Sequence, residues 1–199
     1  MYKLLIAPTC FLAASAVFAA DKPIINAPSY DFAQVSLVQT EFADLDMFTP
    51  KGFEFKASKV LGMNVFGEAT YFMADDKTQG VNMDVDRWKV AVGYIHRFSN
   101  RTVLDGKVGY GEIDIKINDS VNAVSAGTEY LTGEANIRHM IANNVEVYGG
   151  LEWQKWDEGS DQKAYKLGTQ YFWDSIAVGG EYTKFSDSEV FAAFVRYTF

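Results

Sequence analysis

The sequence predicts an all-β protein, a transmembrane antiparallel up-and-down β-barrel of ten strands, with eight strands as the alternative. Ten segments alternate apolar and polar residues at intervals of roughly 18 residues, which is the period of half-buried strands. After the N-terminal apolar stretch, no apolar run is long enough for a spanning helix. Mean hydropathy is close to neutral, as expected where lipid-facing and lumen-facing residues alternate.

Residues 1–19 have the pattern of a secretory signal peptide. Lys3 supplies a positive charge, residues 4–18 are mostly apolar, and small residues precede a cleavage site after Ala19. Cleavage after Ala20 stays open as a second possibility.

Residues 20–199 then form one domain, the barrel. The only cysteine, Cys10, lies in the predicted signal, so the mature chain has no disulfide to form. The formal net charge is −8, and removal of Lys3 with the signal makes it −9. So acidic a chain is a poor partner for nucleic acid, whose phosphates need clustered Lys and Arg.

The order of segments and connections predicts the topology. The segments are residues 30–40, 52–59, 64–74, 86–98, 102–117, 126–140, 145–156, 163–172, 176–185 and 189–199. Longer acidic connections (41–51, 75–85, 118–125, 157–162 and 186–188) alternate with short turns (60–63, 99–101, 141–144 and 173–175). Short turns on the periplasmic side and longer loops outside are typical of outer-membrane barrels. The eight-strand alternative arises because the second segment is short and could belong to a long first loop.

The last segment suits a tilted bilayer crossing, because one face is apolar and the strand ends on an aromatic residue. The apolar face consists of Phe191, Ala193, Val195, Tyr197 and Phe199. Here the sequence resembles bacterial outer-membrane β-barrels, whose final strand typically ends in Phe after alternating aromatic or apolar residues. The resemblance implies a C-terminal insertion signal, formed by Phe191, Val195, Tyr197 and Phe199 and read by the barrel-assembly machinery.

Together with the signal and the ten segments, the whole mature chain resembles the small OmpA- and OmpX-like barrels, without a periplasmic domain after Phe199. The resemblance implies a monomer in the cell outer membrane, surrounded by outer-membrane lipid and lipopolysaccharide.

The fifth segment departs from simple alternation. Leu104, Val108 and Tyr110 share one face, whereas Ile113, Ile115 and Ile117 occupy the other register. Either a β-bulge near the glycines between them or projection of the strand above the membrane would explain the change.

The inward faces carry a balanced set of charges, seven acidic and six basic. The set is Glu54, Lys56, Glu68, Lys89, Asp105, Lys107, Glu134, Arg138, Glu146, Glu152, Lys166, Glu181 and Arg196. Side chains can fill the interior of so small a barrel, and unpaired buried ions would be costly. We therefore expect a salt-bridged plug, with a narrow ion-conducting pore as the alternative.

Other site classes have weaker support. Paired carboxylates in the predicted loops could bind Ca²⁺ or Mg²⁺, but none has EF-hand spacing, and a solvated face is the better explanation. His96 and His139 both precede predicted periplasmic turns, and neither is part of the His-x-Ser arrangement that lipid A deacylases carry. We therefore expect no catalytic, cofactor or metal site, and an enzyme ranks third. In the first loop, we expect the apolar tip around Phe48 to fold over the barrel mouth.

Function is thus expected to be structural or a surface interaction, in an outer-membrane barrel with a plugged lumen. A small porin or ion channel is the alternative.

Overall fold

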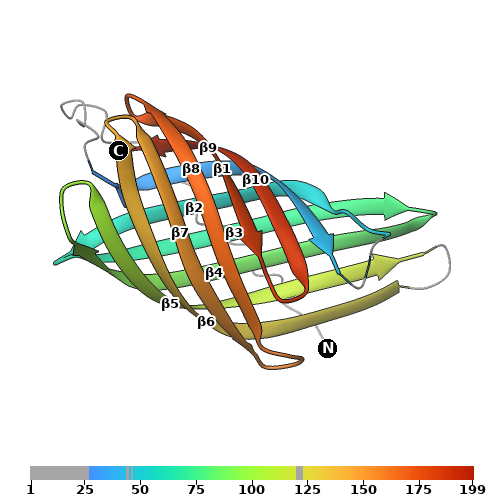
Figure 1. Ribbon diagram of the computed structural model, residues 1–199. Helices are drawn as coiled ribbons and strands as arrows, with labels where there is room; N and C mark the ends of the chain where they lie inside the picture. Colours follow the sequence, from blue (N-terminus) through green and yellow to red (C-terminus); the bar gives the residue numbers. More distant parts are fainter. Residues whose placement is uncertain (1–26, 44, 46, 120–122) are drawn as a thin grey trace.

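The computed structural model shows a closed barrel of ten antiparallel strands (Figure 1). It describes residues 27–43, 45, 47–119 and 123–199. The predicted signal peptide lies outside these residues. Over the described residues, no helix is long and apolar enough to cross a membrane.

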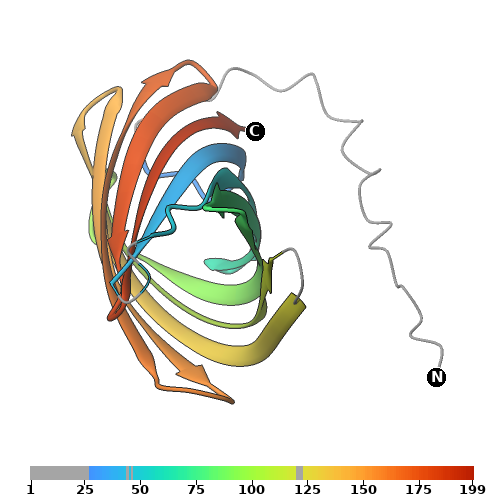
Figure 2. The ribbon, with the colours of Figure 1, turned by 90° about the vertical axis from the view of Figure 1, so that its right-hand side faces the viewer.

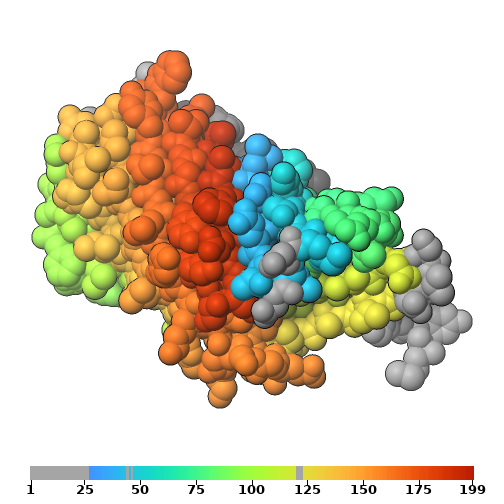
Figure 3. All heavy atoms as spheres, turned by 45° about the vertical axis from the view of Figure 1, so that its right-hand side comes forward, coloured from blue at the N-terminus to red at the C-terminus, as the bar shows by residue number. Residues whose placement is uncertain are grey.

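The strands follow one another around the barrel in chain order. They are β1 (Phe32–Phe42), β2 (Lys51–Gly62), β3 (Val65–Thr78), β4 (Val81–Arg97), β5 (Thr102–Asn118), β6 (Ala123–Ala142), β7 (Val145–Trp156), β8 (Gln162–Trp173), β9 (Ile176–Lys184) and β10 (Ser188–Thr198). β1 pairs with β10, from Phe32 opposite Thr198 to Phe42 opposite Ser188, and this seam closes the barrel. In Figure 3 the seam lies where blue β1 meets red β10. The ten-strand prediction is confirmed, because β2 is a full member of the wall between β1 and β3.

The β3–β4 and β5–β6 hairpins run further than predicted at their outer ends. The prediction of a loop over residues 75–85 is wrong, because β3 and β4 pair up to Thr78 and Val81. Only Gln79 and Gly80 form the turn between them. Both turn residues have positive φ angles, +52° and +85°, which suits a tight hairpin with the twist of its strands. β5 and β6 likewise pair as far as Asn118 and Ala123. Residues 75–84, 113–119 and 123–128 therefore form an outer extension that projects beyond the other hairpins (Figure 1).

The fifth strand contains no β-bulge. Its pairing with β4 and β6 runs without a register shift from Thr102 to Asn118. Ile113, Ile115 and Ile117 therefore lie on the same inward face as Lys107, and the outward face changes from apolar to charged above Tyr110. The strand projects above the apolar band, as the second of the two explanations requires.

The exterior has an apolar band with an aromatic boundary. Exposed apolar side chains of the band include Leu37, Val92, Val108, Leu151, Leu167 and Val178. At its upper edge the Trp88 and Tyr110 ring centroids lie 5.6 Å apart, and Trp88 Nε1 donates a hydrogen bond to Glu112 Oε2 at 3.1 Å. Tyr71 Oη donates to Asp86 Oδ1 at 3.3 Å. Such rings, apolar below and hydrogen-bonded above, are typical of a membrane interface.

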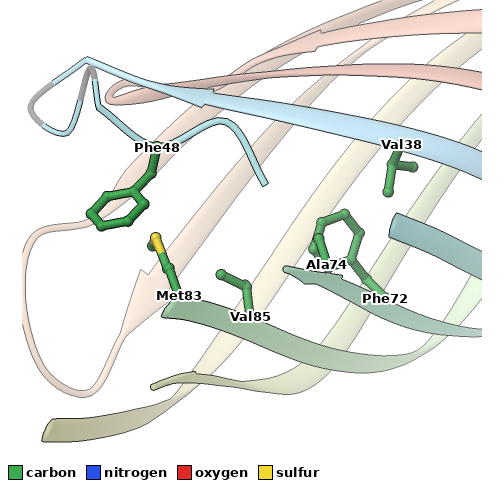
Figure 4. Close-up of a cluster of buried hydrophobic side chains, with 6 residues drawn as sticks. All are labelled: Val38, Phe48, Phe72, Ala74, Met83 and Val85. Atoms are coloured by element: carbon green, nitrogen blue, oxygen red, sulfur yellow. The ribbon is translucent and has the colours of Figure 1, made fainter. Parts of the chain in front are cut away.

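The interior is layered. Next to the extension lies an apolar cluster of Val38, Phe48, Phe72, Ala74, Met83 and Val85 (Figure 4). Phe48 comes from the loop between β1 and β2 and is 4 % exposed, so the predicted folding of this loop over the mouth is confirmed for Phe48. Below the cluster the inner wall becomes charged. Viewed from the mouth end, the strands curve around this interior (Figure 2).

Candidate functional site

The centre of the lumen is a carboxylate shared by three lysines. Glu134 on β6 has a fully buried side chain. Its Oε1 accepts a hydrogen bond from Lys89 Nζ at 2.5 Å, and its Oε2 lies 3.1 Å from Lys107 Nζ and 3.0 Å from Lys166 Nζ. These lysines belong to β4, β5 and β8. Because β8 reaches the same carboxylate as β4 and β5, the cluster ties distant parts of the wall together across the lumen.

Two of these lysines also contact a second carboxylate. Lys107 Nζ lies 2.5 Å from Glu68 Oε1, and Lys89 Nζ lies 3.6 Å from Glu152 Oε1. The charged side chains therefore alternate in sign across the barrel, which offsets the cost of removing each from water. A separate pair on β2 joins Lys56 to Glu54 at 3.4 Å.

The turn end of the lumen is closed by the segment before β1. Arg138 makes a bidentate ion pair with Glu146, from Nε to Oε1 at 2.7 Å and from Nη2 to Oε2 at 3.1 Å. Its Nη1 donates to the Ser29 carbonyl at 2.9 Å, and its guanidinium lies over the Tyr30 ring. Tyr30 is 4 % exposed and donates to Asp105 at 2.6 Å. Arginine thus anchors an entering chain segment inside the barrel base.

Two charged residues of the predicted set have neutral partners. Arg196 Nε and Nη2 both donate to the Gln34 side-chain oxygen, at 2.9 and 2.6 Å, across the β1–β10 seam. Glu181 accepts a hydrogen bond from Tyr148 Oη at 2.9 Å. Arg196 is thus a hydrogen-bonded member of the seam, with Phe32 stacked 4.0 Å from its guanidinium. Arg196, one of the six basic residues predicted for the lumen, thus has an amide as its hydrogen-bond partner among the described residues.

Sequence reasoning missed Arg87. Its side chain is 20 % exposed and faces inward from β4, two residues before Lys89. Adding it to the predicted set of six basic residues gives seven, matching the seven acidic ones. The alternation that placed Lys89 inward also places Arg87 inward, so the signal was present.

Three cavities follow one another through the barrel. The mouth cavity, of about 300 Å³, lies beside the outer extension and is lined by apolar and polar side chains in similar number, Arg87 among them. A second cavity of about 50 Å³ shares Arg87, Phe185 and Val190 with it and lies among the charged residues. A third, of about 60 Å³ near the base, shares Lys56, Glu68, Lys107, Lys166 and Glu181 with the second.

The histidines lie at the turn end, exposed on the outward-facing side. His96 packs edge-on against Phe98, and His139 Nδ1 lies 2.9 Å from the Thr102 hydroxyl. In the described part of the chain, no group of three or more His, Cys, Asp and Glu side chains could hold a metal ion. Most of the carboxylates predicted for the second loop stand instead on the outward face of the extension, where Asp75 is directly opposite Asp84.

Comparison with known proteins bears on the fold. No protein-family model and no curated protein matches the sequence. Among solved structures, the translocator domain of autotransporter NalP from Neisseria meningitidis is similar, with a TM-score of 0.51, 12 % identity, and coverage of 84 % of this chain and 87 % of that one. The β domain of the Bordetella autotransporter BrkA has a TM-score of 0.50 and 12 % identity, covering 84 % and 98 %.

These likenesses concern the fold alone, because the identities are so low. The chain folds as a small outer-membrane-type β-barrel. Its narrower resemblance to OmpA- and OmpX-like barrels stays a prediction.

Proposed function

We propose that the protein is an integral barrel of the bacterial outer membrane with a closed lumen and a structural or surface-interaction role. The observation that carries the proposal is the Glu134 cluster, in which β4, β5 and β8 all contribute an ammonium to one buried carboxylate. A path for ions along the axis would have to separate these charges, each buried and hydrogen-bonded. The proposed surroundings are outer-membrane lipid and lipopolysaccharide, with insertion by the barrel-assembly machinery and a monomeric final state.

A narrow pore is the second candidate, and the chain of three cavities favours it. The cavities share lining residues, so modest movement of lysine side chains would join them into one polar path. An enzymatic role ranks below both, since the histidines stand exposed at the turn end.

Planar-bilayer recording of the purified protein distinguishes the two candidates. A closed lumen gives no steady conductance above that of the bare bilayer. Steady channels in the wild type would refute the plug, and their reversal potential in a salt gradient would then report the selectivity of the pore. The Glu134→Gln variant is the sharper test of the mechanism. If the cluster is the barrier, loosening it raises the frequency of channel events.

A further inference from the structure

The mouth cavity has two kinds of wall that suggest a ligand with two ends. Apolar side chains form one part of the lining, from β3, β4 and β5 on one side and from β7 and β10 on the other. They include Phe72, Val85, Ile113, Ile115, Trp156 and Val190. Apolar walls combined with polar groups that fix a ligand's orientation are found in small-molecule sites, and the mouth of a β-barrel is a frequent place for one.

At the floor stands a cation that no carboxylate holds closely. The nearest carboxylate oxygen to Arg87 among the described residues is Glu54 Oε2, 4.0 Å from Nη2, and none of their acceptors takes a hydrogen bond from its guanidinium. The guanidinium instead lies over the Phe72 and Phe185 rings, 5.0 and 6.0 Å from their centroids. Aromatic contacts fix such a group in place while its planar N–H edge stays able to bind a carboxylate with two bonds.

Two buried polar atoms of the same wall also lack a protein partner. The Thr40 hydroxyl belongs to a residue only 5 % exposed and makes no hydrogen bond with the described chain. The Gln162 side-chain oxygen is likewise unpartnered, although its Nε2 donates to Asp187 at 2.7 Å. Both residues line the cavity, but these two atoms have almost no surface open to it, so each becomes a partner for water or a bound polar group only after its side chain rotates.

The volume and charge of the cavity limit which ligands it can bind. A volume of about 300 Å³ corresponds to roughly ten non-hydrogen atoms, at about 30 Å³ for each water-sized group. Among the described residues that line the cavity, Arg87 is the only basic one, and it matches a single negative charge. Glu158 and Asp187 also line the cavity, so each further negative charge on a ligand adds repulsion, which favours a singly charged carboxylate over a doubly charged phosphate.

We infer that the mouth cavity binds a small amphipathic carboxylate, a medium-chain fatty acid in size and shape, with its carboxylate on Arg87 and its apolar body between the extension and β10. The Thr40 hydroxyl supplies a further donor once its side chain rotates toward the cavity. The site lies on the mouth side of the charged lumen, so the inference goes beyond the proposed function and does not depend on whether the lumen conducts.

Trp156 provides a reporter inside the cavity. We would titrate the detergent-solubilised protein with 8-bromooctanoate, whose bromine quenches tryptophan fluorescence, and compare it with the Trp156→Phe variant. The expected result is a saturable quenching component that Trp156→Phe lacks, since the remaining tryptophans contact only probe dissolved in the detergent. Equal quenching in both proteins would overturn the inference.

The role of Arg87 is tested by comparing a charged ligand with a neutral one. Arg87→Gln should weaken binding of 8-bromooctanoate by about tenfold or more, the effect of losing a charge-assisted hydrogen-bond pair. It should leave binding of the neutral 8-bromo-1-octanol unchanged. Thr40→Val should weaken the acid by about two- to tenfold. An unchanged affinity for the acid in Arg87→Gln refutes the assignment.

A cavity-filling variant keeps the inference testable if Arg87→Gln does not fold, as judged by heat-modifiable gel mobility. Ile113→Phe combined with Ile115→Phe adds two rings to the wall opposite β10 and leaves every charge in place. The saturable component should disappear. Its persistence at wild-type affinity would place the probe elsewhere and overturn the site.

Discussion

Replacing Glu134 by glutamine tests the central cluster, and the structure sets the size of the effect. Lys89 and Lys107 each keep a second carboxylate within 3.6 Å, so the substitution leaves them paired. Lys166 has no other carboxylate within ion-pair distance among the described residues. The cost is therefore that of one uncompensated buried charge, about 3 to 5 kcal/mol of unfolding free energy, and not three times that amount.

The same reasoning predicts a rescue. Removing the stranded ammonium with Lys166→Met should restore about 2 kcal/mol or more to the Glu134→Gln protein, because the two sites are coupled. Urea unfolding in detergent micelles, followed by heat-modifiable gel mobility and tryptophan fluorescence, measures both values. Glu158→Gln, in an exposed loop, is the matched control for loss of a carboxylate. The reasoning fails if Glu134→Gln costs no more than this control, or if Lys166→Met adds to the loss.

Three further predictions concern the mouth, the base and the end of the chain. Phe48→Ala should cost about 3 kcal/mol, because it removes a buried ring from the apolar cluster, whereas Met47→Ala, at a residue 49 % exposed, should cost less than about 0.5 kcal/mol in the same urea assay. Arg138→Gln should release the segment before β1, which faster amide exchange or proteolysis of that segment would reveal. An unaltered exchange rate would show that the segment is held by other contacts. Phe199→Ala should lower the yield of heat-modifiable protein in cell membranes more than Tyr94→Ala does, while both purified proteins refold. Equal yields would count against an insertion signal at Phe199.

Alternation predicted the architecture well because the side-chain period of a strand is two, and a continuous register carries it along the whole chain. The thirteen predicted lumen residues stand on the inner wall for that reason. The same rule covered Arg87, which was overlooked. The strict alternation of inward and outward side chains also continues through Ile113 and its neighbours. Apolar residues occupy the inner face there because the strand has left the bilayer and faces the apolar cluster.

The partners inside the lumen were beyond sequence reasoning. The alternation of residues along a strand predicts which face of the wall a side chain occupies, but not its position along the barrel axis. That position depends on the stagger between strands when the barrel closes. Glu134 meets Lys166 across a lumen, from strands that are not neighbours. Arg196 meets an amide because closure sets Gln34 directly opposite it. The predicted loop lengths were wrong because acidic residues between two segments fit an exposed hairpin as well as a loop.

The β1–β10 seam also governs the order in which this protein can form. Its hydrogen bonds join Gln34 to Arg196, residues 162 positions apart, so no part of the seam exists until the last strand is in place. The equilibrium penalty for so long a closure is modest, since each doubling of loop length costs about 0.6 kcal/mol, but the kinetic delay is large. Until then β1 and the growing end each expose an unpaired edge, ready to bind another chain. A chain that lost β10 would be an open, aggregation-prone sheet, not a smaller barrel.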